Sequence, residues 1–299
     1  MTNISTYRFS LLGMVLSGVV VICSCSRESV PAQASSPVVS FAVDVPEDLM
    51  DVETKTTQVT SLASTGFNVV AVTGEPGSES LSWGPTAFTG STVFTGGRYW
   101  PMSGDPGWVF YASNASMTFA AGGTTVSASN ATDVVVARKA DATVRTRNTL
   151  VFTHVFSRIG NVIVSEDFGY TVSDISIKIT PKTGGTYNLR TGAWSSLSAG
   201  SATEIAPEDP GMAMNDLYLV PGTYTLSASW HVEKGVYSED FVNVEADVTL
   251  IAGHLHMMDI VLGGNASSII INLTLSPWGE LSLDFESGEY MTNINVIAA

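Results

Sequence analysis

The sequence predicts an all-β protein built from β-sandwich domains. Short runs rich in Val, Ile, Phe, Tyr and Thr recur along the chain, with Gly-, Ser- and Pro-containing turns between them about every 8–12 residues. No stretch of helical length repeats its apolar residues with the period of an α-helix. Hydrophobic residues make up 44% of the 299 residues and charged residues only 14%, so the chain has ample material for buried cores.

The first element in the chain is an export signal over residues 1–24. Arg8 precedes a mostly apolar run at residues 9–22, which is the order found in a secretory signal peptide. This run is shorter than the roughly 20 apolar residues that a membrane-spanning helix needs.

The leader ends in the sequence ICSC at residues 22–25, which resembles the lipobox of bacterial lipoproteins. The resemblance implies cleavage between Ser24 and Cys25, with diacylglycerol on the Cys25 thiol and a further acyl chain, such as palmitate, on the new amine. Two or three acyl chains hold a protein firmly on a membrane without spanning it. The alternative is a simple secretory leader that contains two incidental cysteines.

Composition excludes several kinds of site. Both cysteines of the sequence, Cys23 and Cys25, lie in the leader motif, so the mature chain has no disulfide framework and no cysteine-based metal site. The net charge of −15 repels nucleic acid, and neither DNA nor RNA is expected as a partner. The polar residues 25–37 are expected to form a tether between the lipid and the first domain.

The length predicts two domains, placed at residues 38–145 and 146–299. The connection is expected in residues 138–148, which carry four basic residues and no apolar side chain larger than valine. Residues 67–73 are the clearest strand of the first domain, and residues 149–158 are expected to form one long strand of the second. The full set of expected strands covers residues 38–45, 58–62, 67–73, 81–83, 91–100, 108–112, 133–137, 149–158, 161–164, 170–180, 217–220, 223–232, 236–244, 248–251, 258–262, 268–275, 281–284 and 290–297.

The order of motifs along the chain resembles that of a known family. After the lipobox and the tether come SFAV (40–43), TKTT (54–57), FNV (67–69), YWP (99–101), VFYA (109–112), DVVVA (133–137), FTHVFSRI (152–159), LVPGTYTL (219–226) and PWG (277–279). Together these motifs resemble the fimbrillin family of Bacteroidales lipoprotein pilins, the type V pilus subunits. The resemblance covers nearly the whole chain.

The resemblance implies two transthyretin-like β-sandwich domains in tandem and the role of a structural subunit of a cell-surface fimbria, or pilus. It also implies export to the outer membrane as a lipoprotein, followed by proteolytic removal of the N-terminal segment with its first strand. The vacated groove then accepts an extended strand from another pilin subunit, of the same or a different kind. Backbone hydrogen bonds give such strand addition its strength, and alternate side chains set its register.

Residues 38–45 are the expected removable strand. Lys55 follows this strand, and it is the only basic residue between Arg27 and Arg98. A trypsin-like protease is therefore expected to cut after Lys55, although the family's usual cut follows an arginine.

The donor strand is expected in residues 286–299. Alternate positions of a strand share one face, and here one set is Tyr290, Thr292, Ile294 and Val296. The alternative is that this segment is simply the last strand of the second domain. The two interpretations remain open.

No catalytic residue, cofactor or metal site is predicted. His254 and His256 would share one face of a strand, but only Asp259 is near enough in sequence to be a third ligand, so metal binding is disfavoured. His154 lies on an apolar-alternating strand and is expected to be a hydrogen-bonded core residue. The sequence contains no nucleophile elbow, P-loop, dinucleotide fingerprint or zincin motif, so no enzyme is expected.

A monomeric surface lipoprotein that binds a glycan or a host ligand is the second function considered. The sequence contains 6 tryptophans, and such rings can stack on sugars. Tryptophans beside Gly or Pro at strand ends more often pack into a core. A groove lined by exposed tryptophans would favour this binding function, and a C-terminal strand that leaves its domain would favour the pilin.

Overall fold

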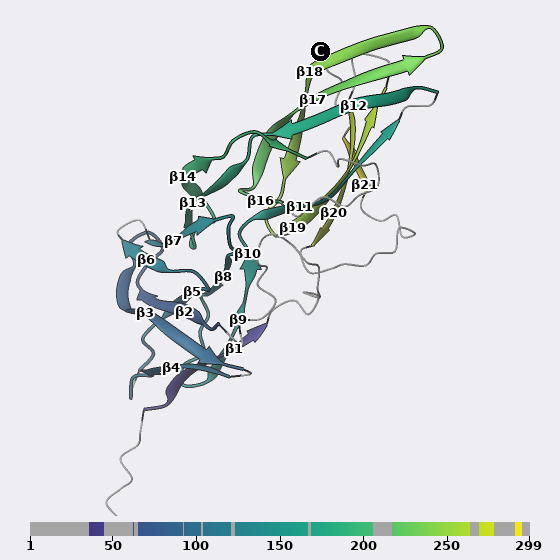
Figure 1. Cartoon of the computed structure of the whole chain (residues 1–299). Helices are drawn as coiled ribbons and strands as arrows, with labels where there is room; N and C mark the ends of the chain where they lie inside the picture. Colours follow the sequence, from purple (N-terminus) through teal and green to yellow (C-terminus); the bar gives the residue numbers. More distant parts are fainter. Residues whose placement is uncertain are drawn as a thin grey trace, which may run out of the picture. The chain divides into compact units, whose positions relative to one another are not determined.

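The computed structural model describes residues 36–44, 62, 65–91, 93–102, 104–120, 123–166, 169–205, 217–263, 269–277 and 291–294. In these ranges every regular element is a β-strand, so the expected all-β fold is confirmed (Figure 1). The described ranges contain no helix long and apolar enough to cross a membrane.

The largest sheet, called here the N-terminal sheet, has eight strands in the order β10-β8-β5-β2-β3-β4-β1-β9. Its strands are β1 (Val38–Asp44), β2 (Phe67–Thr73), β3 (Ser80–Gly90), β4 (Phe94–Tyr99), β5 (Val109–Ser113), β8 (Val135–Lys139), β9 (Arg147–Val151) and β10 (Thr153–His154). The first strand in the sequence therefore lies near one end of this sheet, between β4 and β9.

The N-terminal sheet curls over its own core. Phe41 of β1 packs against Phe110 of β5 although β2, β3 and β4 separate these strands in the sheet order. A flat sheet would hold the two rings several strand spacings apart, at about 4.8 Å per spacing. The curled sheet thus works as the two layers of a sandwich around one hydrophobic core, called here the N-terminal core. This core contains Val39, Phe41, Leu62, Phe67, Val69, Ala71, Phe88, Phe94, Trp100, Phe110, Ala112, Val135, Ala137, Leu150 and Phe152.

A second sheet, the bridging sheet, combines strands from the two halves of the sequence. Its order is β14-β13-β7-β6, with β6 (Met117–Ala120), β7 (Gly123–Ser129), β13 (Lys182–Asn188) and β14 (Trp194–Ala199). At Gly184 of β13, an added Cβ would lie 2.3 Å from the carbonyl oxygen of Ala128 in β7. Glycine is thus required for β13 to approach β7.

Strand β2 is buried on both faces because two cores share it. Val69 and Ala71 face the N-terminal core, whereas Val70 and Val72 belong to a separate core beneath the bridging sheet. This bridging core also contains Tyr111, Met117, Val126, Ala128, Val134, Val136, Val155, Phe156, Leu189, Tyr218 and Val220. It ties strands from the first half of the chain to segments from the second.

Two further sheets form the C-terminal sandwich. One has the order β16-β11-β19-β20-β21, with β16 (Leu217–Leu219), β11 (Ser157–Glu166), β19 (His254–Leu262), β20 (Ile270–Pro277) and β21 (Met291–Ile294). The other has the order β15-β12-β17-β18, with β15 (Thr203–Glu204), β12 (Thr171–Ile179), β17 (Gly222–Lys234) and β18 (Tyr237–Leu250). Strands β17 and β18 form a long hairpin (Figure 1).

The prediction of one long strand at residues 149–158 is wrong. The segment is divided among β9, β10 and the start of β11, because its apolar residues enter two different cores and the next apolar residue, Ile159, enters a third. Leu150 and Phe152 enter the N-terminal core, Val155 and Phe156 enter the bridging core, and Ile159 enters the C-terminal sandwich. Strand β9 follows residue 145 and pairs with β1 in the N-terminal sheet, and the domain boundary at residue 145 stays a prediction.

Candidate functional site

Strand β1 fills a position between β4 and β9, called here the β1 slot (Figure 1). It runs antiparallel to β4, with Phe41 opposite Phe94, and parallel to β9, with Phe41 opposite Asn148. Just before the strand, the Trp100 N–H donates to the Pro37 carbonyl at 2.8 Å. Both edges of β1 are therefore engaged, and its removal would leave two unpaired strand edges facing each other.

Side chains of β1 alternate between the core and the surface. Val39 and Phe41 are completely buried, whereas Val38 is 42% exposed. The Phe41 ring lies 5.1 Å from the Phe88 ring and 5.0 Å from the Phe110 ring, measured between centroids, with both pairs edge to face. Such contacts add about 0.5–1.5 kcal/mol per pair to the burial of the ring. β1 therefore supplies a central part of the core.

Several of the sequence-predicted site residues lie outside the described residues: Ser24, Cys25, Lys55, Tyr290 and Val296. Thr292 and Ile294 lie in β21, which pairs antiparallel with β20 so that Thr292 is opposite Leu273 and Ile294 opposite Ile271. This pairing is the arrangement expected of a last strand of the second domain. The donor role of residues 286–299 stays a prediction.

The described histidines have structural partners. His154 is buried, and its Nδ1 lies 2.8 Å from the Asp133 carboxylate, as expected for a hydrogen-bonded core residue. Both ring nitrogens of His256 bond to the backbone: Nδ1 lies 3.1 Å from the Arg158 carbonyl, and Nε2 accepts from the Ile251 N–H at 2.9 Å. Burial lowers the pKa of His256 to about 4, so this ring is neutral at pH 7. No cluster of potential metal ligands occurs among the residues that the structure describes.

Tryptophans of the described ranges pack against cores. Trp100 and Trp230 are 1% and 2% exposed. Trp83 and Trp108 pack against the N-terminal core, and Trp194 packs against the bridging core. None of these five rings is exposed as a whole, since two are buried and three are partly buried, and all of them pack against core residues.

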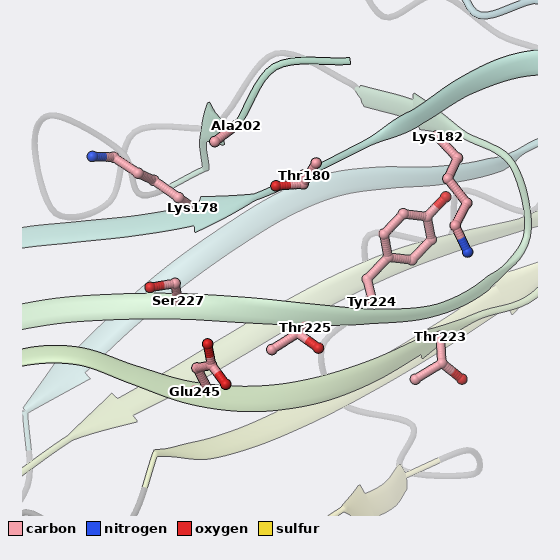
Figure 2. A pocket seen from close by; sticks show the side chains of 9 residues that line it. All are labelled: Lys178, Thr180, Lys182, Ala202, Thr223, Tyr224, Thr225, Ser227 and Glu245. Atoms are coloured by element: carbon pink, nitrogen blue, oxygen red, sulfur yellow. The ribbon is translucent and has the colours of Figure 1, made fainter. Parts of the chain in front are cut away.

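A pocket of about 460 Å³ lies on the sheet formed by β12, β17 and β18 (Figure 2). Its lining is mostly Lys, Thr and Ser and contains no tryptophan; the residues are Lys178, Thr180, Lys182, Ala202, Thr223, Tyr224, Thr225, Ser227 and Glu245. The one aromatic residue, Tyr224, is only 4% exposed and donates its hydroxyl to the Val220 carbonyl. This pocket is therefore not the tryptophan-lined groove that would favour the binding function.

A family model for fimbrillin-like proteins matches residues 51–278. The chain belongs to the fimbrillin-like family. The match begins after β1 and ends just before the segment expected to hold the donor strand. Membership of this family supports a structural role as a subunit of a fimbria at the cell surface.

This fimbrillin-like protein shares its fold with the first of three solved structures that it resembles. A fimbrial protein from Bacteroides vulgatus is 15% identical, with a TM-score of 0.50, over 80% of this chain and 99% of the other. A proposed cell adhesion protein from Bacteroides uniformis is 17% identical, with a TM-score of 0.48, over 81% and 98% of the two chains. A fimbrial assembly protein from Parabacteroides distasonis is 11% identical, with a TM-score of 0.39, over 80% and 98%. No curated protein matches the chain.

Proposed function

We propose that this protein is a fimbrial subunit that polymerises by donor-strand exchange at the β1 slot. A trypsin-like protease cuts after Lys55, β1 leaves, and a strand of a neighbouring subunit takes its place. The observation that supports this proposal most directly is the position of β1. It is the first strand of the fold, yet it is paired on both edges and carries the fully buried Phe41.

A single cut is enough to separate β1 from the rest of the fold. Lys55 lies in the sequence between β1, which ends at Asp44, and β2, which begins at Phe67. After this cut, only backbone pairing and side-chain packing hold β1 in the sheet. An empty slot would expose apolar side chains and two strand edges, which favours capture of another strand.

The proposed incoming strand is the C-terminal segment, residues 286–299, of another subunit. Its alternating residues Tyr290, Thr292, Ile294 and Val296 would replace the inward side chains of β1, and its backbone would restore the pairing to β4 and β9. Before the cut, lipid on Cys25 holds the subunit at the outer membrane. Assembly would thus start at the surface from a lipid-anchored precursor.

The experiment is protease treatment of the purified chain, followed by intact mass and SDS-resistant laddering. The proposal expects one cut after Lys55, loss of the N-terminal fragment and a ladder of multimers. Lys55→Ala is expected to stay intact and monomeric. A chain that ends at residue 285 is expected to be cut but to form no ladder. Clean cleavage of the full chain without multimers would contradict the proposal.

A further inference from the structure

Two segments that border the β1 slot are bonded to each other without involving β1. Nε and Nη2 of Arg145 lie 3.3 and 3.2 Å from the carbonyl oxygen of Pro101, and Nη2 also lies 2.5 Å from the carbonyl oxygen of Met102. Pro101 and Met102 follow β4, whereas Arg145 lies two residues before the start of β9. These three residues are called here the Arg145 bracket.

The turn that carries Arg145 is held in shape by a buried side chain. Asn148 is 3% exposed; its Oδ1 accepts from the Thr143 N–H at 2.7 Å, and its Nδ2 donates to the Thr143 carbonyl at 3.0 Å. Arg145 itself has a φ of 59°, in the left-handed region that costs a non-glycine residue free energy. Such a conformation persists where the surrounding contacts determine it.

The register places the bracket at one end of the slot. Val38, at the start of β1, is opposite Tyr99 at the end of β4, and Ser40 is opposite Arg147 at the start of β9. The end of β4 and the start of β9 thus lie at the same end of β1. The bracket joins the two walls there, beside the bond between the Trp100 N–H and the Pro37 carbonyl.

We propose that Arg145 is a positioning residue that keeps this end of the slot formed after β1 has left. The inference rests on the proposed function, since it concerns the empty slot. At the bracketed end, β4 and β9 stay far enough apart for one strand to pair between them. An incoming strand therefore pairs there first, and its pairing then extends along β4 and β9. A slot that is already in its binding geometry loses less conformational entropy when it captures a strand.

The test compares Arg145→Ala with Lys178→Ala, which removes one positive charge from an exposed residue of β12, outside the N-terminal sheet. The probe is a fluorescent synthetic peptide with the sequence of residues 36–45, supplied in excess to the chain after the cut at Lys55. The rate of peptide capture is measured by fluorescence anisotropy. The urea midpoint of the uncut chain is measured for each variant.

Arg145→Ala is expected to lower the capture rate about tenfold, because hydrogen bonds that hold the walls together are lost. Its uncut chain is expected to keep a urea midpoint close to that of Lys178→Ala, since β1 then holds the walls itself. Arg145→Lys restores part of the rate, because lysine keeps the charge but not the planar fork. If Arg145 had only a structural role in the uncut chain, its replacement would lower the capture rate and the urea midpoint together.

Equal capture rates for wild type and Arg145→Ala would overturn the inference and leave the proposed function standing. A urea midpoint that falls in proportion to the capture rate would also overturn it. Failure of the cut wild-type chain to capture any peptide would overturn the proposed function, and the inference with it.

Discussion

The rings of Phe41 and Phe110 meet edge to face with their centroids 5.0 Å apart, across the interior of the curled N-terminal sheet. One ring comes from the first strand of the fold and the other from β5. Through this contact β1 closes a core that the remaining strands build. The uncut chain should therefore depend on β1 for stability.

Phe41→Ala is expected to destabilise the uncut chain by about 3–5 kcal/mol, the usual cost of removing a fully buried phenylalanine. Val38→Ala on the same strand removes a side chain that is 42% exposed, and it should cost much less. Urea denaturation of both variants measures the difference. Equal losses would mean that β1 does not form part of the core.

Tyr111→Phe tests the bridging core. The Tyr111 hydroxyl donates to Glu79 Oε1 at 2.8 Å, and the Glu79 side chain is only 4% exposed. Loss of a hydrogen bond to a buried carboxylate is expected to cost about 1.5–3 kcal/mol. Tyr99→Phe, at a tyrosine that is 57% exposed, is the matched control and should be nearly neutral in the same urea titration. A Tyr111→Phe variant as stable as this control would show that the hydrogen bond to Glu79 does not stabilise the bridging core.

The lowered pKa of His256 is expected to make the folded protein less stable in acid. Its folded pKa is about 4, lowered from 6.5 chiefly by burial, so the unfolded chain binds a proton before the folded chain does. The stabilisation is complete above about pH 6.5 and is lost as the pH falls towards 4, by about 3 kcal/mol. Wild type should therefore lose that much more stability between pH 7 and pH 4 than His256→Gln. Parallel pH profiles of the two proteins would contradict this.

The raised pKa of His231 is expected to change stability with pH in the opposite direction. Its pKa is raised, first by its hydrogen bond to Asp240 and also by Glu233. The charged form is favoured in the folded state, so this contribution is present below the unfolded pKa and is lost as the pH rises through the folded pKa. The stability difference between wild type and His231→Gln should shrink from pH 5 to pH 8 in urea titrations. A difference that grows over this range would be the wrong sign.

Strands with strong hydrophobic patterning could be predicted from the sequence. Residues 67–73 are β2, which has a continuous apolar run, and residues 223–232 fall within β17, where buried and more exposed side chains alternate. Both patterns are typical of strands that line a core. The bridging sheet could not be predicted. β13 has the sequence KTGGTYN, which lacks an apolar run, and it forms a strand because Gly184 allows close approach to β7.

The neighbours of β1 were also beyond prediction from the sequence. Its strand character follows from alternating Val39, Phe41 and Val43, but its partners lie far along the chain in β4 and β9. Arg145 gave no signal in the sequence beyond its basic charge. Its role depends on backbone carbonyls, which every residue carries, and on a turn shaped by Asn148.

Locking β1 in place tests whether it must leave its slot for subunits to join. Ser40 and Thr95 are directly opposite on antiparallel strands, a pairing whose Cα separation of about 4.5–5.5 Å suits a disulfide. The double variant Ser40→Cys/Thr95→Cys is prepared from residue 25 onward in a Cys25→Ser background and cut with a trypsin-like protease. Ser40→Cys alone is the control.

The measurement is the SDS-resistant ladder of the cut double variant, with and without reductant. If β1 must leave, the oxidised protein stays monomeric although it is cut, and reduction restores a ladder like that of the single variant. A full ladder from the oxidised, locked protein would show that subunits join without emptying the β1 slot, and it would contradict donor-strand exchange at this slot.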